Sequence, residues 1–165
     1  GFAASIYLRG IKYIQIPTTL LAQVDSAHGG KTGINFSNYK NQIGSFYLPI
    51  ATIIDPRFIK SLSPELVVDG LGEIIKAGFI KDPSILSLLE KYTVETLVKS
   101  FDLEKIIKKS IAVKEYFVGK DFRDNNLRSI LNVGHTFGHA IELKYKISHG
   151  KSGLFRPKKS NRREK

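Results

Sequence analysis

Four polar side chains recur at helical spacing in the segment from Arg128 to His139. Arg128, Asn132, His135 and His139 are separated by four, three and four residues, which places all four on one face of a helix. The residues between them are mostly apolar, as is typical of a buried helix. A buried row of one cation, one amide and two imidazoles is costly unless it meets a ligand, a metal or matched polar partners. A single histidine of this kind would more simply be a hydrogen-bonded core residue, but four in register favour a binding or catalytic site.

A carboxylate that could act with these histidines lies at Glu73, among apolar residues of a predicted helix. A partly buried carboxylate needs a partner, and Lys76 at i+3 would be the purely structural one. Alternatively, Glu73, His135 and either His139 or His149 would form a ligand set for Zn²⁺ with an open position for water or substrate. The spacing is not that of the His-Glu-x-x-His proteases, so a zinc protease is not indicated.

A second candidate region is the glycine-rich segment from Asp25 to Gly33, which we expect to be a loop. Its Gly-Gly-Lys-Thr sequence resembles a nucleotide phosphate loop, but that motif needs a glycine where Asp25 stands, which excludes it. A flexible backbone beside Lys31 can still hold an anion, and Lys40 and Asn41 add a cation and an amide nearby. The alternative is a glycine turn with surface lysines. His28, in the same loop, is expected not to be a metal ligand.

The composition is that of a globular protein. The 165 residues are 42% hydrophobic and 25% charged, and no apolar run approaches the length of a membrane span. The absence of cysteine excludes disulfides and thiolate metal sites and fits a reducing compartment, so we expect a cytoplasmic protein with no secretory signal. Methionine is also absent, which favours a chain that begins inside a larger protein over one with a processed terminus.

The net charge of +11 is concentrated at the C-terminus. Residues 151–165 contain seven Lys/Arg and one Glu, which is a net +6. Such a tail could contact nucleic acid, but the stretch from Arg156 onward has no aromatic residue for base stacking. We therefore expect a solvated, disordered tail.

The pattern along the chain predicts a strand-containing part followed by an all-helical part. A helix end over residues 1–9 precedes short strands expected over 11–16, 32–36 and 51–54, with a polar loop at 39–44. Helices are expected to begin at Ser63 and Asp82, to run from Asp102 to about Phe122, and to run from Leu127 to about Tyr145. Three glycines within residues 70–78 would each weaken the first of these helices by about 1 kcal/mol relative to alanine, so something should approach its backbone closely.

Taken in order, these motifs resemble the 3-dehydroquinate synthase family across residues 1 to 150. The matching segments are Tyr7-Leu-Arg-Gly10, Pro17-Thr-Thr-Leu-Leu-Ala-Gln-Val-Asp-Ser26, Gly29-Gly-Lys-Thr-Gly33, Lys40-Asn41, Gly72-Glu-Ile-Ile-Lys76 and Leu131-Asn-Val-Gly-His-Thr-Phe-Gly-His-Ala-Ile-Glu142. The resemblance implies the end of a Rossmann-like, α/β NAD-binding domain at residues 1–62. A helical metal-binding and substrate-binding domain would follow at 63–150, and the basic tail at 151–165.

The resemblance also implies a reaction of the shikimate pathway. The family converts 3-deoxy-D-arabino-heptulosonate 7-phosphate to 3-dehydroquinate and phosphate, through transient oxidation by NAD, phosphate elimination, re-reduction and aldol closure. It uses NAD and a divalent metal, usually Zn²⁺ or Co²⁺. The substrate carries a carboxylate and a phosphate monoester, so several cations must surround it.

Site residues follow from the same resemblance. The expected metal ligands are Glu73, His135 and His149, and the expected catalytic residues are Lys76, Lys114, Arg128, Asn132 and His139. Substrate contacts are expected from Lys31, Asn41 and Arg9, of which Arg9 would reach into the neighbouring subunit of a homodimer. The residues expected along NAD are Thr18, Thr19, Asp25, Ser26, Lys31, Lys40, Phe58, Ile59, Lys60, Ser61 and Leu62.

Several departures from the family pattern leave other functions open. A Gly-Gly-Gly-x-x-x-Asp segment should precede Gly1, Leu66 stands where the family often has Glu, and the match stops after His149-Gly150. These departures predict a central fragment that is inactive alone. The alternatives are another sugar-phosphate cyclase of the valiolone or scyllo-inosose type, a metal-dependent polyol dehydrogenase, and a non-catalytic piece whose tail contacts nucleic acid.

Overall fold

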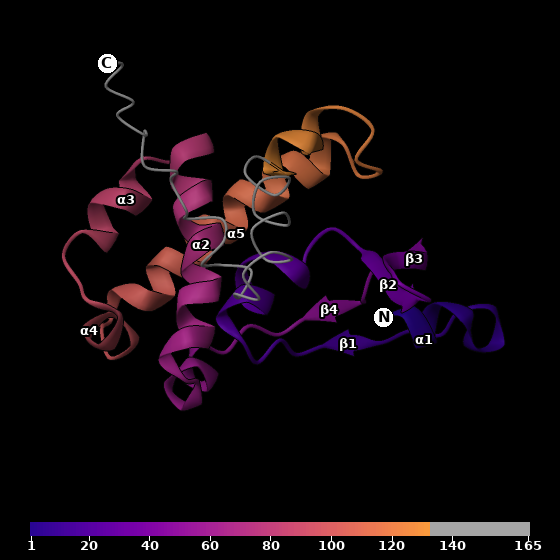
Figure 1. Cartoon of the computed structure of the whole chain (residues 1–165), viewed down its shortest axis with the longest axis horizontal. Coiled ribbons are helices and arrows are strands. Elements are labelled where there is room, and N and C mark those ends of the chain that lie inside the picture. Colours follow the sequence, from indigo (N-terminus) through magenta and orange to yellow (C-terminus); the bar gives the residue numbers. More distant parts are fainter. Residues whose placement is uncertain (133–165) are drawn as a thin grey trace, which may run out of the picture.

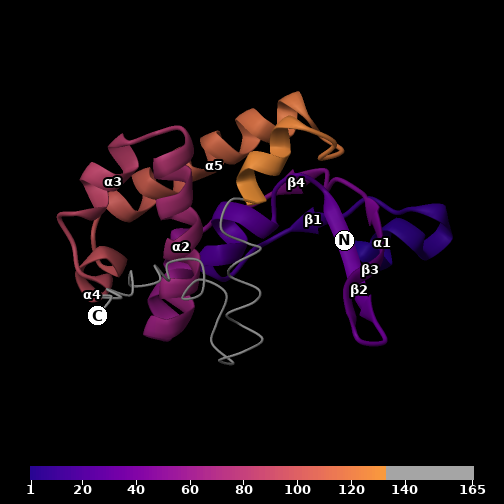
Figure 2. The same ribbon diagram turned by 45° about the horizontal axis from the view of Figure 1, so that its top comes forward.

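The computed structural model describes residues 1–132, in which helices predominate and two of the strands, β1 and β4, have only two residues each (Figure 1). The helices and strands are α1 Phe2–Ile6, β1 Ile14–Gln15, β2 Lys31–Phe36, β3 Tyr39–Phe46, β4 Ala51–Thr52, α2 Pro64–Ile80, α3 Ser84–Leu89, α4 Val94–Val98 and α5 Asp102–Lys120. Helices α2 to α5 gather at one end of the molecule, and α1 lies with β2 and β3 at the other in both views (Figures 1 and 2). No helix in the described part of the chain is long and apolar enough to cross a membrane.

The strands form two separate pairs. β1 and β4 are parallel, with Ile14 opposite Ala51, whereas β2 and β3 form an antiparallel hairpin with Lys31 opposite Phe46. The prediction of a polar loop at residues 39–44 is wrong, because this segment is part of strand β3. The backbone of β3 pairs with β2 across a tight turn at Ser37, which has a φ of 51°. Cross-strand pairing therefore overrides the low strand propensity of its lysine, asparagine and glycine residues.

The predicted glycine loop is shorter than expected. Ala22–Ser26 is a π-helical turn, so Asp25 and Ser26 are helical, and Lys31 is already the first residue of β2. The side chain of Gln23 is fully buried, and its amide donates to the carbonyls of Pro17 (3.2 Å) and Asp55 (2.8 Å). The Gln23 amide links the turn to the segments that follow β1 and β4. Only residues 27–30 lie between the turn and β2.

The helical part largely follows the sequence expectations. α2 begins at Pro64 after Ser63, and Asp82 accepts a hydrogen bond from the amide of Ser84 at the start of α3. α5 ends two residues before Phe122, and its N-cap is Phe101 rather than Asp102, whose carboxylate accepts from the Tyr92 hydroxyl. α4 was not expected. It begins with a capping box in which Thr93 and Thr96 bond each other's backbone amides, a pattern that the usual Glu or Gln would have made easier to recognise.

The two parts of the molecule meet where the turn at Ala22–Ser26 and the preceding Leu20 pack on α2 and α5. A methyl group on Gly70 would lie 2.5 Å from Leu20 Cγ, and one on Gly78 would lie 2.7 Å from Leu86 Cδ2. The close neighbour expected from the glycines of α2 is therefore present at both positions. Leu20 is fully buried and joins the same core as Ile74 of α2 and Ile106 of α5.

The helix expected from Leu127 to Tyr145 is described only at its start, which is a 3₁₀ helix over Leu127–Asn132. Residues four apart on a 3₁₀ helix do not share a face, because each residue turns the chain by about 120°. Arg128 is buried and Asn132 is exposed. The prediction that these two residues lie on one face is therefore wrong here, and His135 and His139 lie outside the described residues.

Candidate functional site

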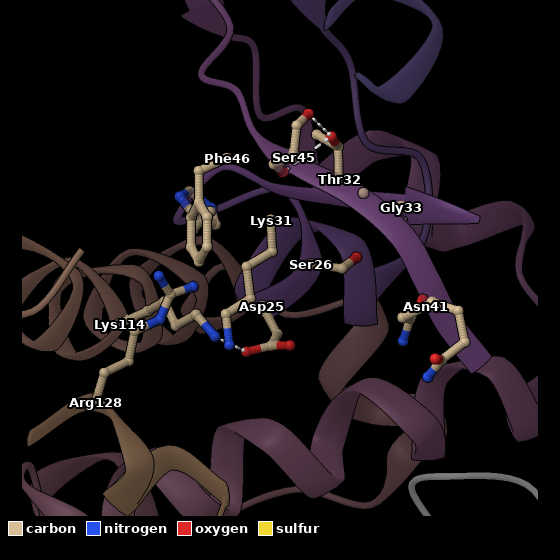
Figure 3. Close-up of a pocket in the computed structure, with 13 residues that line it drawn as sticks. Asp25, Ser26, Lys31, Thr32, Gly33, Asn41, Ser45, Phe46, Lys114 and Arg128 are labelled. Atoms are coloured by element: carbon tan, nitrogen blue, oxygen red, sulfur yellow. Dashed lines mark hydrogen bonds and ion pairs between the residues drawn. The ribbon is translucent and has the colours of Figure 1, made fainter. Parts of the chain in front are cut away.

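A cavity of about 660 Å³ opens between the glycine loop, the β2–β3 hairpin and the helical part (Figure 3). Asp25, Ser26 and His28 line it from the turn and loop, and Lys114 and Arg128 line it from the helical side. The hairpin supplies the remaining lining residues, which are Lys31, Thr32, Gly33, Asn41, Gln42, Gly44, Ser45 and Phe46. Among residues 1–132 the lining thus contains three permanent cations and one carboxylate, a balance that favours an anionic ligand.

The first cation, Lys114, projects from α5 towards the turn. Its Nζ donates to Asp25 Oδ1 at 2.5 Å, and the lysine side chain is only 13% exposed. The family resemblance implied that Asp25 lies along NAD and that Lys114 is catalytic, and the structure brings the two side chains together as an ion pair.

Lys31 stands at the start of β2 and forms an ion pair with Asp124, in the loop that follows α5. Lys31 is half-exposed, whereas Asp124 is largely buried. Asp124 was not among the expected site residues. The cluster of Asp and Asn residues from Asp121 to Asn126 was a usable signal, because such clusters favour turns in which short polar side chains bond the backbone.

Arg128 is 3% exposed and has a clear structural role. Its Nη1 donates to the carbonyl of Gly29 at 3.1 Å and to that of Phe122 at 2.8 Å. A methyl group on Gly29 would lie 2.2 Å from Arg128 Nη2, and Gly29 has a φ of +89°. The positive φ favours glycine at position 29, and a side chain there would also displace the buried Arg128 guanidinium from its hydrogen bonds.

Glu73 and Lys76 form the i+3 ion pair that was the structural alternative for Glu73, and both side chains are nearly buried. They border a small second cavity that is also lined by Asp25 and Lys114, so Glu73 and the larger cavity are neighbours. Within residues 1–132 no group of three or more potential metal ligands is found. The expected partners His135 and His149 lie outside the described residues.

His28 is held by the turn that precedes it. Its Nε2 lies 2.8 Å from the carbonyl of Gln23, so this nitrogen carries the proton, and its Nδ1 lies 3.9 Å from Glu115 Oε1. Both ring nitrogens of His28 thus face protein groups.

The other residues expected along NAD are spread over three segments. Thr18 is exposed, whereas Thr19 accepts from the amide of Ala22 and thereby starts the helical turn. Lys40 is exposed on β3. Phe58, Lys60 and Ser61 are exposed on the 3₁₀ helix Pro56–Ser61, followed by the half-buried Leu62, and the fully buried Ile59 faces the core.

The last two expected substrate residues have unusual backbones. Asn41, which lines the cavity from β3, has a φ of 55°, and its amide nitrogen donates to Asn35 Oδ1. Arg9 is exposed, and both it and Leu8 have positive φ, at 66° and 47°. Strained non-glycine residues of this kind are found disproportionately at functional sites.

Residues 1–69 match the family profile described as 3-dehydroquinate synthase N-terminal, and residues 70–153 match 3-dehydroquinate synthase C-terminal. The chain is 54% identical over 162 residues to the 3-dehydroquinate synthase of Dictyoglomus thermophilum, covering 94% of this chain and 46% of that protein. It is 52% identical over 152 residues to the enzyme of Corynebacterium diphtheriae, covering 91% and 42%. The chain thus spans less than half the length of these relatives.

Solved structures give the same grouping. A 2-epi-5-epi-valiolone synthase from Streptomyces hygroscopicus subsp. jinggangensis 5008, with NAD⁺ and Zn²⁺ bound, superposes with a TM-score of 0.83 at 30% identity, covering 93% of this chain and 44% of that one. A 2-deoxy-scyllo-inosose synthase complexed with carbaglucose-6-phosphate, NAD⁺ and Co²⁺ gives 0.77 at 30% identity, covering 92% and 43%. The charged cavity therefore lies in a sugar-phosphate cyclase fold, and the chain belongs to the 3-dehydroquinate synthase family.

Proposed function

We propose that this chain forms the central part of a 3-dehydroquinate synthase that converts 3-deoxy-D-arabino-heptulosonate 7-phosphate to 3-dehydroquinate and phosphate. The observation that carries the proposal is the cationic cavity, in which Lys31, Lys114 and Arg128 converge from three segments of a chain that belongs to this family. A substrate with a carboxylate and a phosphate needs such a group of cations, because charge-assisted hydrogen bonds are the strongest that a protein offers to anions.

Lys114 is the cation that the structure prepares best for this role. Its side chain is nearly buried, and its ammonium, which has three donors, uses one on Asp25. A substrate anion in the cavity would accept from the remaining donors without losing the Asp25 contact. Arg128 would hold the glycine loop in place through the Gly29 carbonyl while presenting its positive charge to the same cavity.

Glu73 suits the role of one metal ligand, because its carboxylate is nearly buried and supplies the oxygen atoms that Zn²⁺ accepts alongside imidazole. His135 and His149 would complete the set. When bound, the metal would polarise a substrate oxygen and NAD would take up and return a hydride. Lys76 balances the charge of Glu73 in this structure and would stand beside the substrate in the complete site.

We further propose the boundaries 1–62, 63–150 and 151–165 for the NAD-binding part, the helical part and the basic tail.

A homodimer in which Arg9 enters the partner's site would account for the exposed, strained backbone at Leu8 and Arg9. Size-exclusion chromatography coupled to light scattering would measure the number of subunits. A cytoplasmic location and the absence of a nucleic-acid role remain proposals that rest on the cysteine-free composition and on the small-molecule cavity.

The test is an assay of phosphate release and dehydroquinate formation with NAD⁺ and Zn²⁺. It uses the 165-residue chain and a chimera in which residues 1–150 replace the aligned segment of the Dictyoglomus thermophilum enzyme. We expect an active chimera and an inactive chain. Failure of a folded chimera to form dehydroquinate would refute the proposal, and preference for a sugar phosphate without a carboxylate would point to another cyclase.

A matched pair of variants in the chimera tests the role of the cavity. Lys114→Ala should lower kcat/KM by about tenfold to a hundredfold, as expected for the loss of a charged hydrogen-bond donor. Lys108→Ala on the same helix α5, where the side chain is 73% exposed and pairs with Glu104, should leave kcat/KM unchanged. Equal effects of the two substitutions would mean that the cavity does not hold the substrate.

A further inference from the structure

Lys31 reaches the cavity already paired with a carboxylate from a distant part of the chain. Asp124 lies 93 residues away in sequence and its Oδ2 accepts from Lys31 Nζ. Asp124 is not among the residues that line the cavity, so it approaches the lysine from outside the lining. The cavity therefore presents Lys31 with part of its charge already neutralised.

The loop that carries Asp124 is built to hold this carboxylate in place. Asp121 accepts hydrogen bonds from the amides of Asn125 (3.0 Å), Asn126 (2.8 Å) and Arg128 (3.1 Å). These bonds fold the loop so that Asp124 adopts a φ of 57°, a conformation that aspartate and asparagine tolerate better than most residues. Arg128, at the end of the same loop, is bonded to Gly29, two residues before Lys31. The loop and the lysine are thus fixed relative to each other.

The pair is nevertheless incompletely satisfied. Within residues 1–132, Asp124 Oδ1 is buried and has no hydrogen-bond partner, although an ionised carboxylate oxygen is a strong acceptor. The side chain of Lys31 is 49% exposed and has free rotations along its length. A phosphate group in the cavity carries more negative charge than one carboxylate, so it can draw the ammonium away from Asp124.

We propose that Asp124 is a resident counter-anion of the cavity, which holds Lys31 in an ion pair that an incoming phosphate group must displace. The proposal rests on the proposed function only in taking Lys31 as an anion ligand. Asp124 is then a positioning residue that acts through Lys31, and it weakens the binding of anions that cannot compete with it. Its effect has a definite sign, because removing the carboxylate strengthens phosphate binding, whereas damage to the site weakens it.

The experiment is calorimetric titration of inorganic phosphate into the 165-residue chain at low ionic strength. Asp124→Asn, which keeps a residue suited to positive φ, should tighten phosphate binding by about two- to fivefold, the range expected for release of a partly exposed ion pair. Asp124→Glu keeps the charge and should bind as the unchanged chain does. Adding Lys31→Ala to Asp124→Asn should abolish the gain.

Glu115→Gln is the matched control for loss of a negative charge near the cavity. Glu115 lies beside His28 and is 66% exposed, and its removal should change phosphate affinity less than Asp124→Asn does. If Asp124→Asn is misfolded by circular dichroism, Asp124→Gly removes the carboxylate and accepts the positive φ, and the same gain is expected.

Unchanged, weaker or unmeasurable phosphate binding by the folded Asp124 variants would overturn the proposal, and so would an equal gain in Glu115→Gln. The two proposals fail separately. If the chimera is inactive but Asp124→Asn binds phosphate more tightly, the role of Asp124 stands and the synthase reaction is refuted. An active chimera without that gain would refute only the role of Asp124.

Discussion

The isoleucines in and directly beside the strands are exposed, whereas those of helices α2, α3 and α5 are buried or partly buried. In the helical part, Ile74, Ile85 and Ile106 are completely buried. In the strand-containing part, Ile14 of β1 and Ile53 after β4 are 54% and 51% exposed. Parallel strands are normally covered on both faces, and a pair of two-residue strands buries little apolar surface. The helical part therefore supplies most of the stability, while the strand-containing part supplies most of the cavity lining.

This difference explains how a weakly packed hairpin can line the candidate site. The β2–β3 hairpin makes few buried contacts of its own, but Lys114, Asp124 and Arg128 reach the glycine loop and its neighbours from the helical side. Ligand-binding loops are generally drawn from the less stable parts of a protein. Here the stable part positions the loop through charged side chains.

The largest expected effect is a direct test of this contrast. Ile106→Ala should lower the free energy of unfolding by about 2–5 kcal/mol, because it removes a fully buried side chain and leaves a cavity. Ile14→Ala on the half-exposed face of β1 should cost less than about 0.5 kcal/mol. Urea unfolding followed by circular dichroism measures both. Equal losses would show that the face of β1 is covered in solution.

A smaller effect is expected at the contact between the two parts. Gly70→Ala would place a methyl group 2.5 Å from Leu20 Cγ and 2.7 Å from the Leu21 nitrogen, so it should destabilise the chain by about 1–3 kcal/mol. Gly119→Ala is the matched control in α5, where nothing lies within 4 Å of the added methyl group. It should stabilise the chain by up to about 0.5 kcal/mol, since alanine has the higher helix propensity and Gly119 lies in the last turn of α5. The same sign for both variants would contradict the close packing of α2 on Leu20.

The smallest expected effect concerns the loop that joins the helical part to the cavity. Hydrogen bonds from the backbone amides of Asn125, Asn126 and Arg128 lower the pKa of Asp121 below its ordinary value of 3.8. A carboxyl with a lowered pKa in the folded state contributes stability above pH 3.8, and this contribution is lost as the pH falls through the folded-state pKa. The stability difference between the unchanged chain and Asp121→Asn should therefore be constant near neutral pH and shrink below about pH 4. A difference independent of pH between 3 and 7 would contradict this role.

The sequence predicted the helical part better than the strand-containing part for a physical reason. Ser63-Pro64 and Asp82-Pro83 are local signals, and the helices after them began as expected because helix capping depends on neighbouring residues. The segment from Tyr39 to Gly44 is polar, and it became a strand only through pairing with β2, which local propensity does not encode. Likewise, the partnership of Lys31 with Asp124 joins residues far apart in the chain, so spacing alone could not reveal it.

Contacts of individual polar side chains were predicted correctly only where the expected helix geometry was present. Sequence spacing correctly offered Lys76 as a partner for Glu73, because residues three apart on a helix meet. The same reasoning failed for Arg128 and Asn132, since the 3₁₀ geometry of residues 127–132 rotates the two side chains apart. The sequence indicated that burying the Arg128 guanidinium would be costly without polar partners. In the structure the guanidinium donates hydrogen bonds to two backbone carbonyls, which offset that cost.

The hydrogen bond from Arg128 to Gly29 spans 99 residues, which has a consequence for how the chain folds. Contacts so distant in sequence form slowly, because a long loop must close before they contribute any stability. The glycine loop can thus reach its final conformation only after α5 and the segment beyond it are in place. During synthesis, the cavity would therefore lack the part of its lining that Arg128 supplies until residue 128 has left the ribosome.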